Sequence, residues 1–323
     1  MIGRREFTTL LGGAAAFAVS CADAQETRIY RLGVLNTLSR QGPPFAPFFD
    51  ELRRLGFVEG GNLIVDARGF AARTEQFLAL AMELANAKVD AILCGGPDAT
   101  RAAQNATRTI PILGNLDDFV AAGLVGSLAH PEGNTTGVSF LATELDGKRQ
   151  EILMELVPGA RHMAALMDVG GTAAKRVQAL RDATRARGVE LAGYVIDRPE
   201  RIVATIDEAR LAGAQALNVL ASPVLNARRF DVFERTQALR LPTIYQWPEN
   251  AKEGGLIAYG PRIGKIYRQL ARQLAKLLRG AKPSEVPIEQ PTSFDLTINT
   301  RVAKEIEIDV PPALLARADE VIE

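Results

Sequence analysis

The sequence predicts an α/β protein with two lobes, each a doubly wound parallel sheet with helices on both faces. Two observations indicate this class. Strand-like and helix-like segments alternate along the chain, which is typical of parallel sheets covered by helices. The alternation also runs through twice, with a break at residues 138–146. Residues 25–323 are enough for two domains of ordinary size.

The first run is expected to build the N-terminal lobe. Its strands are short apolar stretches, and its helices carry apolar residues at helical spacing. Thr74 can cap one helix, Gly56 ends another and Pro131 ends a third. In chain order the predicted elements are a strand at 28–36, a helix at 47–57, a strand at 62–70, a helix at 74–88, a strand at 89–96, a helix at 97–108, a strand at 109–115, a helix at 121–131 and a strand at 135–140.

The second run repeats the pattern and is expected to build the C-terminal lobe. Its predicted elements are a helix at 145–158, a strand at 162–168, a helix at 172–188, a strand at 189–196, a helix at 199–213, a strand at 214–222, a helix at 226–240 and a strand at 241–247. After the stretch EGGLIAYG come one more helix, at 262–280, and a Pro-rich tail with two short strands.

The last helix and the tail follow a completed second run, so we expect the chain to cross between the lobes more than once. The expected N-terminal lobe is 28–138 plus 258–285, and the expected C-terminal lobe is 139–257 plus 286–323. A small-molecule site is favoured in the cleft between such lobes, beyond the carboxyl ends of the strands.

The chain opens with MIGRREFTTLLGGAAAFAVSCADAQ, which resembles a bacterial twin-arginine export signal. Arg4 and Arg5 precede an uncharged run that is too short to span a membrane. We therefore expect residues 1–24 to be a signal peptide and the mature protein to work in the periplasm. Cleavage after Ala24 fits the small-x-small pattern. A weak lipobox at Cys21, which lacks the usual leucine, leaves a lipid anchor open, and a buried first helix of a cytosolic protein is a further alternative.

Composition excludes several classes of function. The formal net charge is +0, so no basic surface argues for nucleic acid. Glycine-rich phosphate loops, HExxH and GxSxG are missing from the sequence. His130 and His162 have no partner at metal spacing, and Cys94 ends an apolar strand as an inert buried thiol would. We expect no enzyme activity, no cofactor and no metal.

Several blocks together resemble the substrate-binding proteins of ABC importers, in the tryptophan/tyrosine-type group. In order along the chain they are RLGVLNTLS, LRRLGFVEGGNLIVDAR, VDAILCGGPDATRAAQNATRTIPIL, AAGLVGSLAHPEGNTTGVS, KRQEILMELVPGARHMAAL and LPTIYQWPENAKEGGLIAYGP. The resemblance implies a periplasmic-binding-protein-like fold, with hinge crossovers, that closes on a small solute and hands it to a membrane permease. It implies a monomer that binds an amino acid, aromatic or not, or another small carboxylate.

One departure from the family pattern bears on the solute. The family usually has Asp-Pro before the GLV segment, whereas this chain has Asp117-Asp118-Phe119. The aspartate is kept at Asp118, but the turn loses its proline and gains an aromatic side chain. The solute can therefore differ from the usual one of the family.

In the first lobe the candidate ligand-binding residues follow three strands. The segment GGPDAT is the most informative, because Pro97 suits a first helical position and leaves first-turn amides free to seat a ligand carboxylate. Asp98 can instead simply cap that helix. Asp118 is a candidate for a ligand ammonium or a solvated turn residue. The whole set is Thr37, Ser39, Arg40, Gly96, Asp98, Ala99, Thr100 and Asp118.

In the second lobe the matching strand ends offer aromatic and polar groups. Tyr245 and Trp247 could stack on a flat apolar ligand, although aromatic residues are more often part of a core. Tyr259 lies near an expected crossover, and Asp168 and Ser222 follow two other strands. The mechanism we expect is capture by lobe closure. Two alternatives remain open: a ligand-sensing domain for a signalling partner, and a periplasmic enzyme, which an exposed and acidic Cys94 thiol would support.

Overall fold

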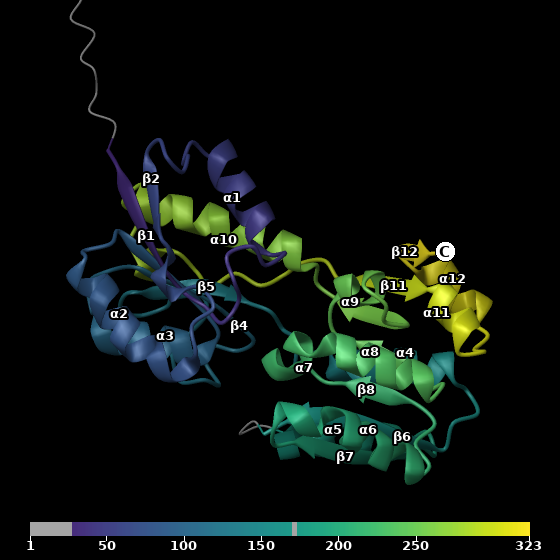
Figure 1. The fold of residues 1–323 in the computed structure, drawn as a ribbon. Coiled ribbons are helices and arrows are strands. Elements are labelled where there is room, and N and C mark those ends of the chain that lie inside the picture. Colours follow the sequence, from purple (N-terminus) through teal and green to yellow (C-terminus); the bar gives the residue numbers. More distant parts are fainter. Residues whose placement is uncertain (1–27, 170–172) are drawn as a thin grey trace, which may run out of the picture.

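The computed structural model describes residues 28–169 and 173–323 (Figure 1). The predicted signal peptide, residues 1–24, lies outside them. The chain folds into two α/β lobes, one on each sheet, which confirms the predicted class. Within the described residues, no helix is long and apolar enough to cross a membrane.

The N-terminal lobe is a five-stranded, all-parallel sheet with helices on both faces. The strand order is β2-β1-β3-β4-β5. The elements are β1 (Tyr30–Leu35), α1 (Phe45–Arg54), β2 (Leu63–Asp66), α2 (Phe77–Asn86), β3 (Ala91–Gly95), α3 (Pro97–Ala106), β4 (Ile112–Leu116), β5 (Thr135–Ser139) and, from much later in the chain, α10 (Ile263–Leu278). Helices α1 and α10 pack on one face, and α2 and α3 on the other.

The C-terminal lobe has a seven-stranded sheet of order β12-β11-β10-β9-β8-β6-β7. Only β10 and β11 pair antiparallel, because the chain re-enters this lobe there from the other. The elements are α4 (Asp146–Leu156), β6 (His162–Asp168), α5 (Ala173–Arg185), β7 (Glu190–Ile196), α6 (Ile202–Leu211), β8 (Leu217–Val219), α7 (Pro223–Ala227), α8 (Arg229–Ala238), β9 (Thr243–Tyr245), α9 (Pro248–Lys252), β10 (Ile257–Gly260), β11 (Asp295–Asn299), α11 (Thr300–Glu305), α12 (Pro312–Arg317) and β12 (Glu320–Ile322).

Four short 3₁₀ segments complete the elements of the described chain: Ala67–Gly69, Thr74–Gln76, Pro199–Arg201 and Pro283–Glu285. The predicted helix at 121–131 is wrong, since this stretch forms turns. Gly123 adopts a positive φ of 63°, and the Asp118 side chain bonds to two amides at the start of the stretch, so the chain bends. Leu124 and Val125 are still buried, in a small cluster with Phe119 and Ile288.

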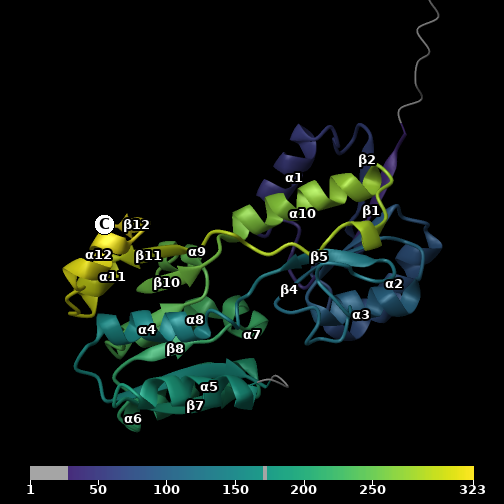
Figure 2. The same cartoon turned by 180° about the vertical axis from the view of Figure 1, so that it is seen from behind.

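Three connections join the lobes. They are residues 140–145 between β5 and α4, 261–262 between β10 and α10, and 290–294 before β11. In both views α10 lies beside α1, although the strand that precedes it, β10, belongs to the other lobe (Figures 1 and 2).

The strand pairing places two boundaries elsewhere than expected. Residues 258–260 belong to β10 of the C-terminal sheet, where they pair with β9 and β11. Glu289 instead bridges to Val138 of the N-terminal lobe, so that the third connection starts after it. Sequence periodicity could not locate these points, because an apolar strand fits either sheet and the Pro-rich segment at 283–291 has no periodic pattern.

Candidate functional site

The carboxyl edge of the N-terminal sheet carries a cluster of neutral polar side chains. Asn36 follows β1 and accepts the Leu38 N–H at 2.9 Å. Asn115 in β4 donates to the Tyr267 hydroxyl of α10 at 3.0 Å. Both asparagines are buried. Burial raises the pKa of Tyr267, so this hydroxyl stays protonated and the Asn36–Asn115–Tyr267 group carries no charge. A Cβ on Gly95 would overlap the Asn36 side chain, which explains the glycine there.

The N-terminus of α3 lies at the same edge. Gly96 caps the helix with a φ of +89°, and Pro97 occupies the first turn as predicted. The first-turn amides of Asp98 and Ala99 have no intrahelical acceptor, and they point out of the helix end. Thr100, however, is buried and its hydroxyl donates to the Gly96 carbonyl at 2.8 Å. The expected bond from that hydroxyl to a ligand is therefore already used inside the helix.

The loop after β1 presents the other three predicted residues differently. Thr37 and Ser39 are exposed. Arg40 forms an ion pair with Glu59, and its guanidinium lies 5.1 Å from the centre of the Phe49 ring. Both contacts hold Arg40 against its own lobe, so it is not free to close over a carboxylate in this arrangement.

The two adjacent aspartates after β4 have different environments. Asp118 is exposed, and one of its carboxylate oxygens accepts the N–H groups of Val120 and Ala121 at 2.9 and 3.0 Å. It therefore caps a turn, which was the alternative to ammonium binding. Asp117 accepts the Thr143 N–H at 3.1 Å and the Thr143 hydroxyl, and so ties the end of β4 to the first connection.

In the C-terminal lobe the structure brings Asp168 and Ser222 together. Asp168 ends β6, Ser222 follows β8, and the serine hydroxyl donates to the Asp168 carboxylate at 2.6 Å. The same hydroxyl oxygen accepts the Leu225 N–H at 3.1 Å and thereby caps α7. Asp168 is only partly buried. One anionic group is thus fixed at the carboxyl edge of this sheet.

The three aromatic residues predicted to bind the ligand, Tyr245, Trp247 and Tyr259, do not line an open site at the strand ends. Tyr245 is buried in the core, edge-on to Phe233 at 5.0 Å, with its hydroxyl near Thr236, so it cannot stack on a ligand. Trp247 packs edge-on against Phe140 of the first connection at 5.6 Å and belongs to the core cluster of the other lobe. Tyr259 is half-buried beside Phe294. The sequence around a single aromatic residue in a strand looks the same whether its side chain packs in a core or contacts a ligand.

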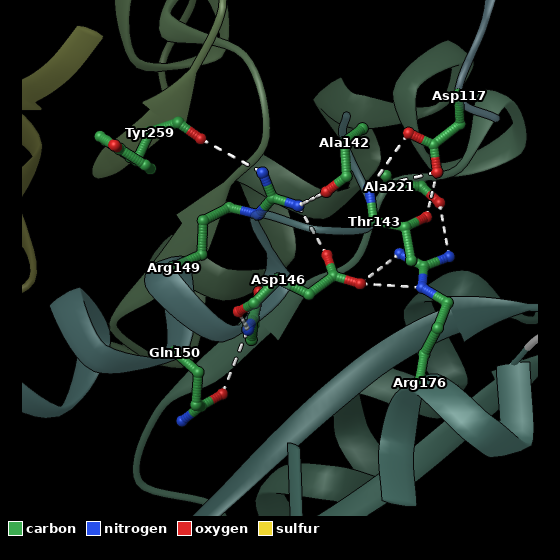
Figure 3. A network of polar contacts seen from close by, with 10 residues as sticks. Asp117, Ala142, Thr143, Asp146, Arg149, Gln150, Arg176, Ala221 and Tyr259 are labelled. Carbon is green, nitrogen blue, oxygen red and sulfur yellow. Dashed lines mark hydrogen bonds and ion pairs between the residues drawn. The ribbon is translucent and has the colours of Figure 1, made fainter. Parts of the chain in front are cut away.

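Sequence reasoning missed a buried ionic network, which Figure 3 shows from close by. Asp146 lies between two arginines: its Oδ1 accepts from Arg149 at 2.6 Å, and its Oδ2 accepts from Arg176 at 2.8 Å. We call Asp117, Thr143, Asp146, Arg149 and Arg176 the connection cluster. The available signal was the pair Asp146 and Arg149, three residues apart in a helix with buried residues around most of its circumference.

Two cavities lie in the C-terminal lobe, at opposite edges of its sheet. One of about 10 Å³, room for about one water molecule, lies at the carboxyl ends of β8 and β9, lined by Val219, Leu225, Asn226, Arg229, Val232, Tyr245, Gln246 and Asn250. A larger one of about 320 Å³ lies at the opposite edge of the same sheet, beside Met163 and Val189. It is remote from the strand ends where the candidate residues gather.

The apparatus for a reaction is not evident in the described part of the chain. Cys94 has an exposure of 0%, and burial raises the pKa of its thiol, so it is neither exposed nor acidic. Among the described residues, no group of three or more His, Cys, Asp or Glu side chains could hold a metal ion.

A family model and a curated relative match most of this chain. The family model of the ABC transporter substrate binding protein matches residues 45–322. A curated relative, the "Tyrosine-binding protein" of Clostridioides difficile (strain R20291), is 23% identical over 267 residues, which cover 81% of this chain and 75% of the relative.

Solved structures share the fold. An ABC domain from Streptococcus pneumonia in complex with L-Trp superposes with a TM-score of 0.81 at 20% identity, over 91% of this chain and 100% of that one. A ligand-free, open substrate-binding protein with adhesive properties from Clostridium difficile gives a TM-score of 0.68 at 22% identity, over 91% and 99% of the two chains.

Proposed function

This chain belongs to the ABC transporter substrate-binding protein family, and we propose that it captures a free amino acid between its lobes and delivers it to a membrane permease. The observation that carries this proposal is a pair of complementary half-sites, one at the carboxyl edge of each sheet. The family is one of binding proteins and not of enzymes. The names of two relatives, one tyrosine-binding and one holding L-Trp, favour an aromatic amino acid.

The N-terminal half-site suits the ligand carboxylate. The free first-turn amides of α3 and the helix dipole both favour an anion. The neighbouring Asn36 and Asn115 side chains are neutral, so they add no competing charge. Asp98 lies in this first turn but is exposed, which leaves its side chain free to turn toward solvent.

The C-terminal half-site suits the ligand ammonium. Asp168 supplies the negative charge, and the Ser222 hydroxyl fixes the orientation of its carboxylate. This assignment replaces Asp118, whose carboxylate already caps a turn. Val169, directly after Asp168, exposes 67% of its surface and offers an apolar contact for the ligand side chain.

A zwitterion held in this way bridges the lobes. Its carboxylate binds one lobe and its ammonium the other, so binding favours the closed arrangement and shifts a hinge equilibrium. Micromolar affinity corresponds to about −8 kcal/mol. Two charge-assisted contacts and one buried side chain can supply that after the costs of ordering.

The test is calorimetric titration of the chain from Gln25 with L-tyrosine and L-tryptophan. Tyramine, which lacks the carboxylate, and 3-(4-hydroxyphenyl)propanoate, which lacks the amine, serve as matched probes. We expect the complete amino acid to bind and both truncated probes to bind at least tenfold more weakly, because each loses a charge-assisted contact of about 1.5–3 kcal/mol.

A pair of variants assigns the ammonium site. Asp168→Asn should weaken amino-acid binding at least tenfold, whereas Asp118→Asn should leave it within about threefold. Equal losses in both variants, or none in Asp168→Asn, would refute the assignment. If no amino acid binds and another small carboxylate does, the ligand class is wrong while the binding function stands.

We also propose that residues 1–24 export the chain to the periplasm. The support is the run RREFTTLL and the apolar stretch that follows it. Replacing Arg4 and Arg5 together by lysine should trap the precursor in the cytoplasm, as cell fractionation would measure. Retention of a lipid on Cys21 would appear as a mass increase of the membrane-bound form.

A further inference from the structure

Arg149 contacts the first connection between the lobes and the strand that leads into the second. Its guanidinium donates to the carbonyl of Ala142, in the first connection, and to the carbonyl of Tyr259 at 3.3 Å, at the end of the strand that leads into the second (Figure 3). One side chain therefore holds the first connection against the end of β10, just before the second connection.

Burying the Arg149 guanidinium costs free energy unless a carboxylate partner compensates its charge. Arg149 has an exposure of 0%, and burial lowers its pKa while the Asp146 charge opposes that shift. Removing one partner of such a pair leaves an uncompensated charge in a medium of low polarity. Asp146 is itself 3% exposed, and it serves Arg149 with one oxygen and Arg176 with the other.

Arg176 extends the contacts to the proposed ammonium site. Its Nη1 donates to the Ala221 carbonyl at 3.1 Å. The next residue, Ser222, donates to Asp168 at 2.6 Å. At the other end, Asp117 of the N-terminal lobe accepts from Thr143 in the first connection. Hydrogen bonds, together with the peptide links between Ala221 and Ser222 and between Ala142 and Thr143, thus connect Asp168 through the cluster to the opposite lobe.

We propose that Asp146, Arg149 and Arg176 are positioning residues for lobe closure: they set the resting angle between the first connection and the end of β10, which leads into the second, and couple it to the occupancy of the Asp168–Ser222 edge. Charge-assisted hydrogen bonds demand particular distances and angles. A cluster of them therefore has few arrangements, unlike an apolar interface that can slide. The ligand coupling rests on the proposed function, whereas the control of the resting angle does not.

Trp247 is a built-in reporter for this proposal. It is the single tryptophan of the chain, and it packs on Phe140, two residues before the Ala142 carbonyl that Arg149 binds. A change in the first connection should alter the surroundings of its indole ring. Excitation at a wavelength that tyrosine does not absorb reads this residue alone.

The experiment uses the chain from Gln25 without any solute. Arg176→Gln removes the link between Asp146 and Ala221 and leaves the Asp146–Arg149 pair in place. The matched control is Arg181→Gln on the same helix, which removes an arginine bond to the Leu191 carbonyl, of 3.1 Å, outside the cluster. We expect Arg176→Gln, and not Arg181→Gln, to shift the Trp247 emission and change the radius of gyration in solution scattering.

The proposal is overturned if Arg176→Gln keeps both the emission and the radius of gyration of the parent chain. Asp146→Asn is a second variant, with an expected larger shift in the same direction. If Asp146→Asn does not fold, Arg176→Gln alone decides.

A second measurement separates the two proposals. Titration with L-tyrosine should give a dissociation constant that changes at least threefold in Arg176→Gln and stays unchanged in Arg181→Gln. If the parent chain does not bind L-tyrosine, the proposed ligand fails, and the solute-free emission still tests the cluster. If L-tyrosine binds equally to all three chains, the coupling to the Asp168–Ser222 edge is refuted.

Discussion

Glu249 places a carboxyl group where the fold disfavours its charge. It lies in the first turn of α9, partly buried near the start of α10. Burial raises its pKa, and the nearby Arg262 and the amides of Ile263 and Gly264 only partly oppose this shift. One of its carboxylate oxygens is buried and has no hydrogen-bond partner among the described residues.

Ionisation of Glu249 should therefore cost stability at neutral pH. A carboxyl whose pKa is raised by folding contributes fully below its unfolded pKa, about 4.3, and that contribution is lost as the pH rises through the folded value. Glu249→Gln cannot ionise, so we expect it to be more stable than the parent at pH 7 and to lose this advantage towards pH 4.

Urea unfolding at both pH values measures the effect. The control is Glu234→Gln, since Glu234 is exposed on α8 and should give the same small difference at either pH. A Glu249→Gln variant that is less stable than the parent at pH 7 would show that the charge is favoured there.

For single residues, the sequence predicted where a side chain lies in the fold better than which bonds it makes. Asp168 and Ser222 were expected at strand ends and do meet there. Asp117 and Asp118 are neighbours of identical chemistry, yet one bonds to the first connection and the other caps a turn. Likewise, the residue type of Thr100 does not indicate whether its hydroxyl donates to the Gly96 carbonyl or to a ligand. The role of Asp117 depends on Thr143, 26 positions away, whereas the roles of Asp118 and Thr100 depend on the exact local backbone conformation.

Arg262 connects three separate elements at the edge of the C-terminal sheet. It caps α10, and its guanidinium pairs with Asp295 of β11 at 2.5 Å and with Glu320 of β12 at 2.7 Å. For Asp295, burial acts to raise the pKa, but the bonds to Arg262 outweigh it and the pKa is lowered. Bonds to Lys252 and Arg262 also lower the pKa of Glu320.

These lowered pKa values predict acid-sensitive stability. Their contribution is present above the unfolded pKa values, about 4, and is lost as the pH falls through the folded values. Arg262→Gln should therefore lower the free energy of unfolding at pH 7, and its deficit relative to the parent should shrink below pH 4.

Chemical unfolding at pH 7 and pH 3 measures this change. Arg272→Gln is the matched control, because Arg272 lies on α10, its side chain is 50% exposed, and it pairs with the single carboxylate of Glu51 at 3.0 Å. Exposed pairs contribute about 0–1 kcal/mol. A deficit for Arg262→Gln that persists unchanged at pH 3 would assign its role to packing instead of charge.

Periodicity predicted the helices and strands well where one face is buried. The strands of both runs were expected within a few residues of their observed ends, because each is a continuous apolar stretch. The segment 121–131 has helical spacing but two glycines, and Leu124 and Val125 are buried in it without helical structure. In this segment the apolar spacing correctly indicates which residues are buried, but the positive φ of Gly123 bends the chain and prevents a helix.

The arrangement of the whole chain was predicted in outline. Helix α10 follows a completed second run of strands and helices, and its return to the N-terminal lobe was expected for that reason. Its packing beside α1 depends on apolar side chains more than 200 positions apart, such as Phe48 and Tyr267, whose ring centres lie 6.4 Å apart. No local pattern encodes such a pairing, and the positions of the three connections follow from it.

The three connections lead to a last prediction, about unfolding. Trp247 of one lobe is part of the core of the other, and the connection cluster binds both. The lobes should therefore unfold together, in one calorimetric transition. A ligand that bridges them should raise that single transition, adding about 2.7 kcal/mol at a ligand concentration 100 times its dissociation constant. Differential scanning calorimetry with and without L-tyrosine measures this. Two resolved transitions of which the ligand moves only one would mean that it binds a single lobe, and the bridging arrangement would then be wrong even though binding itself is real.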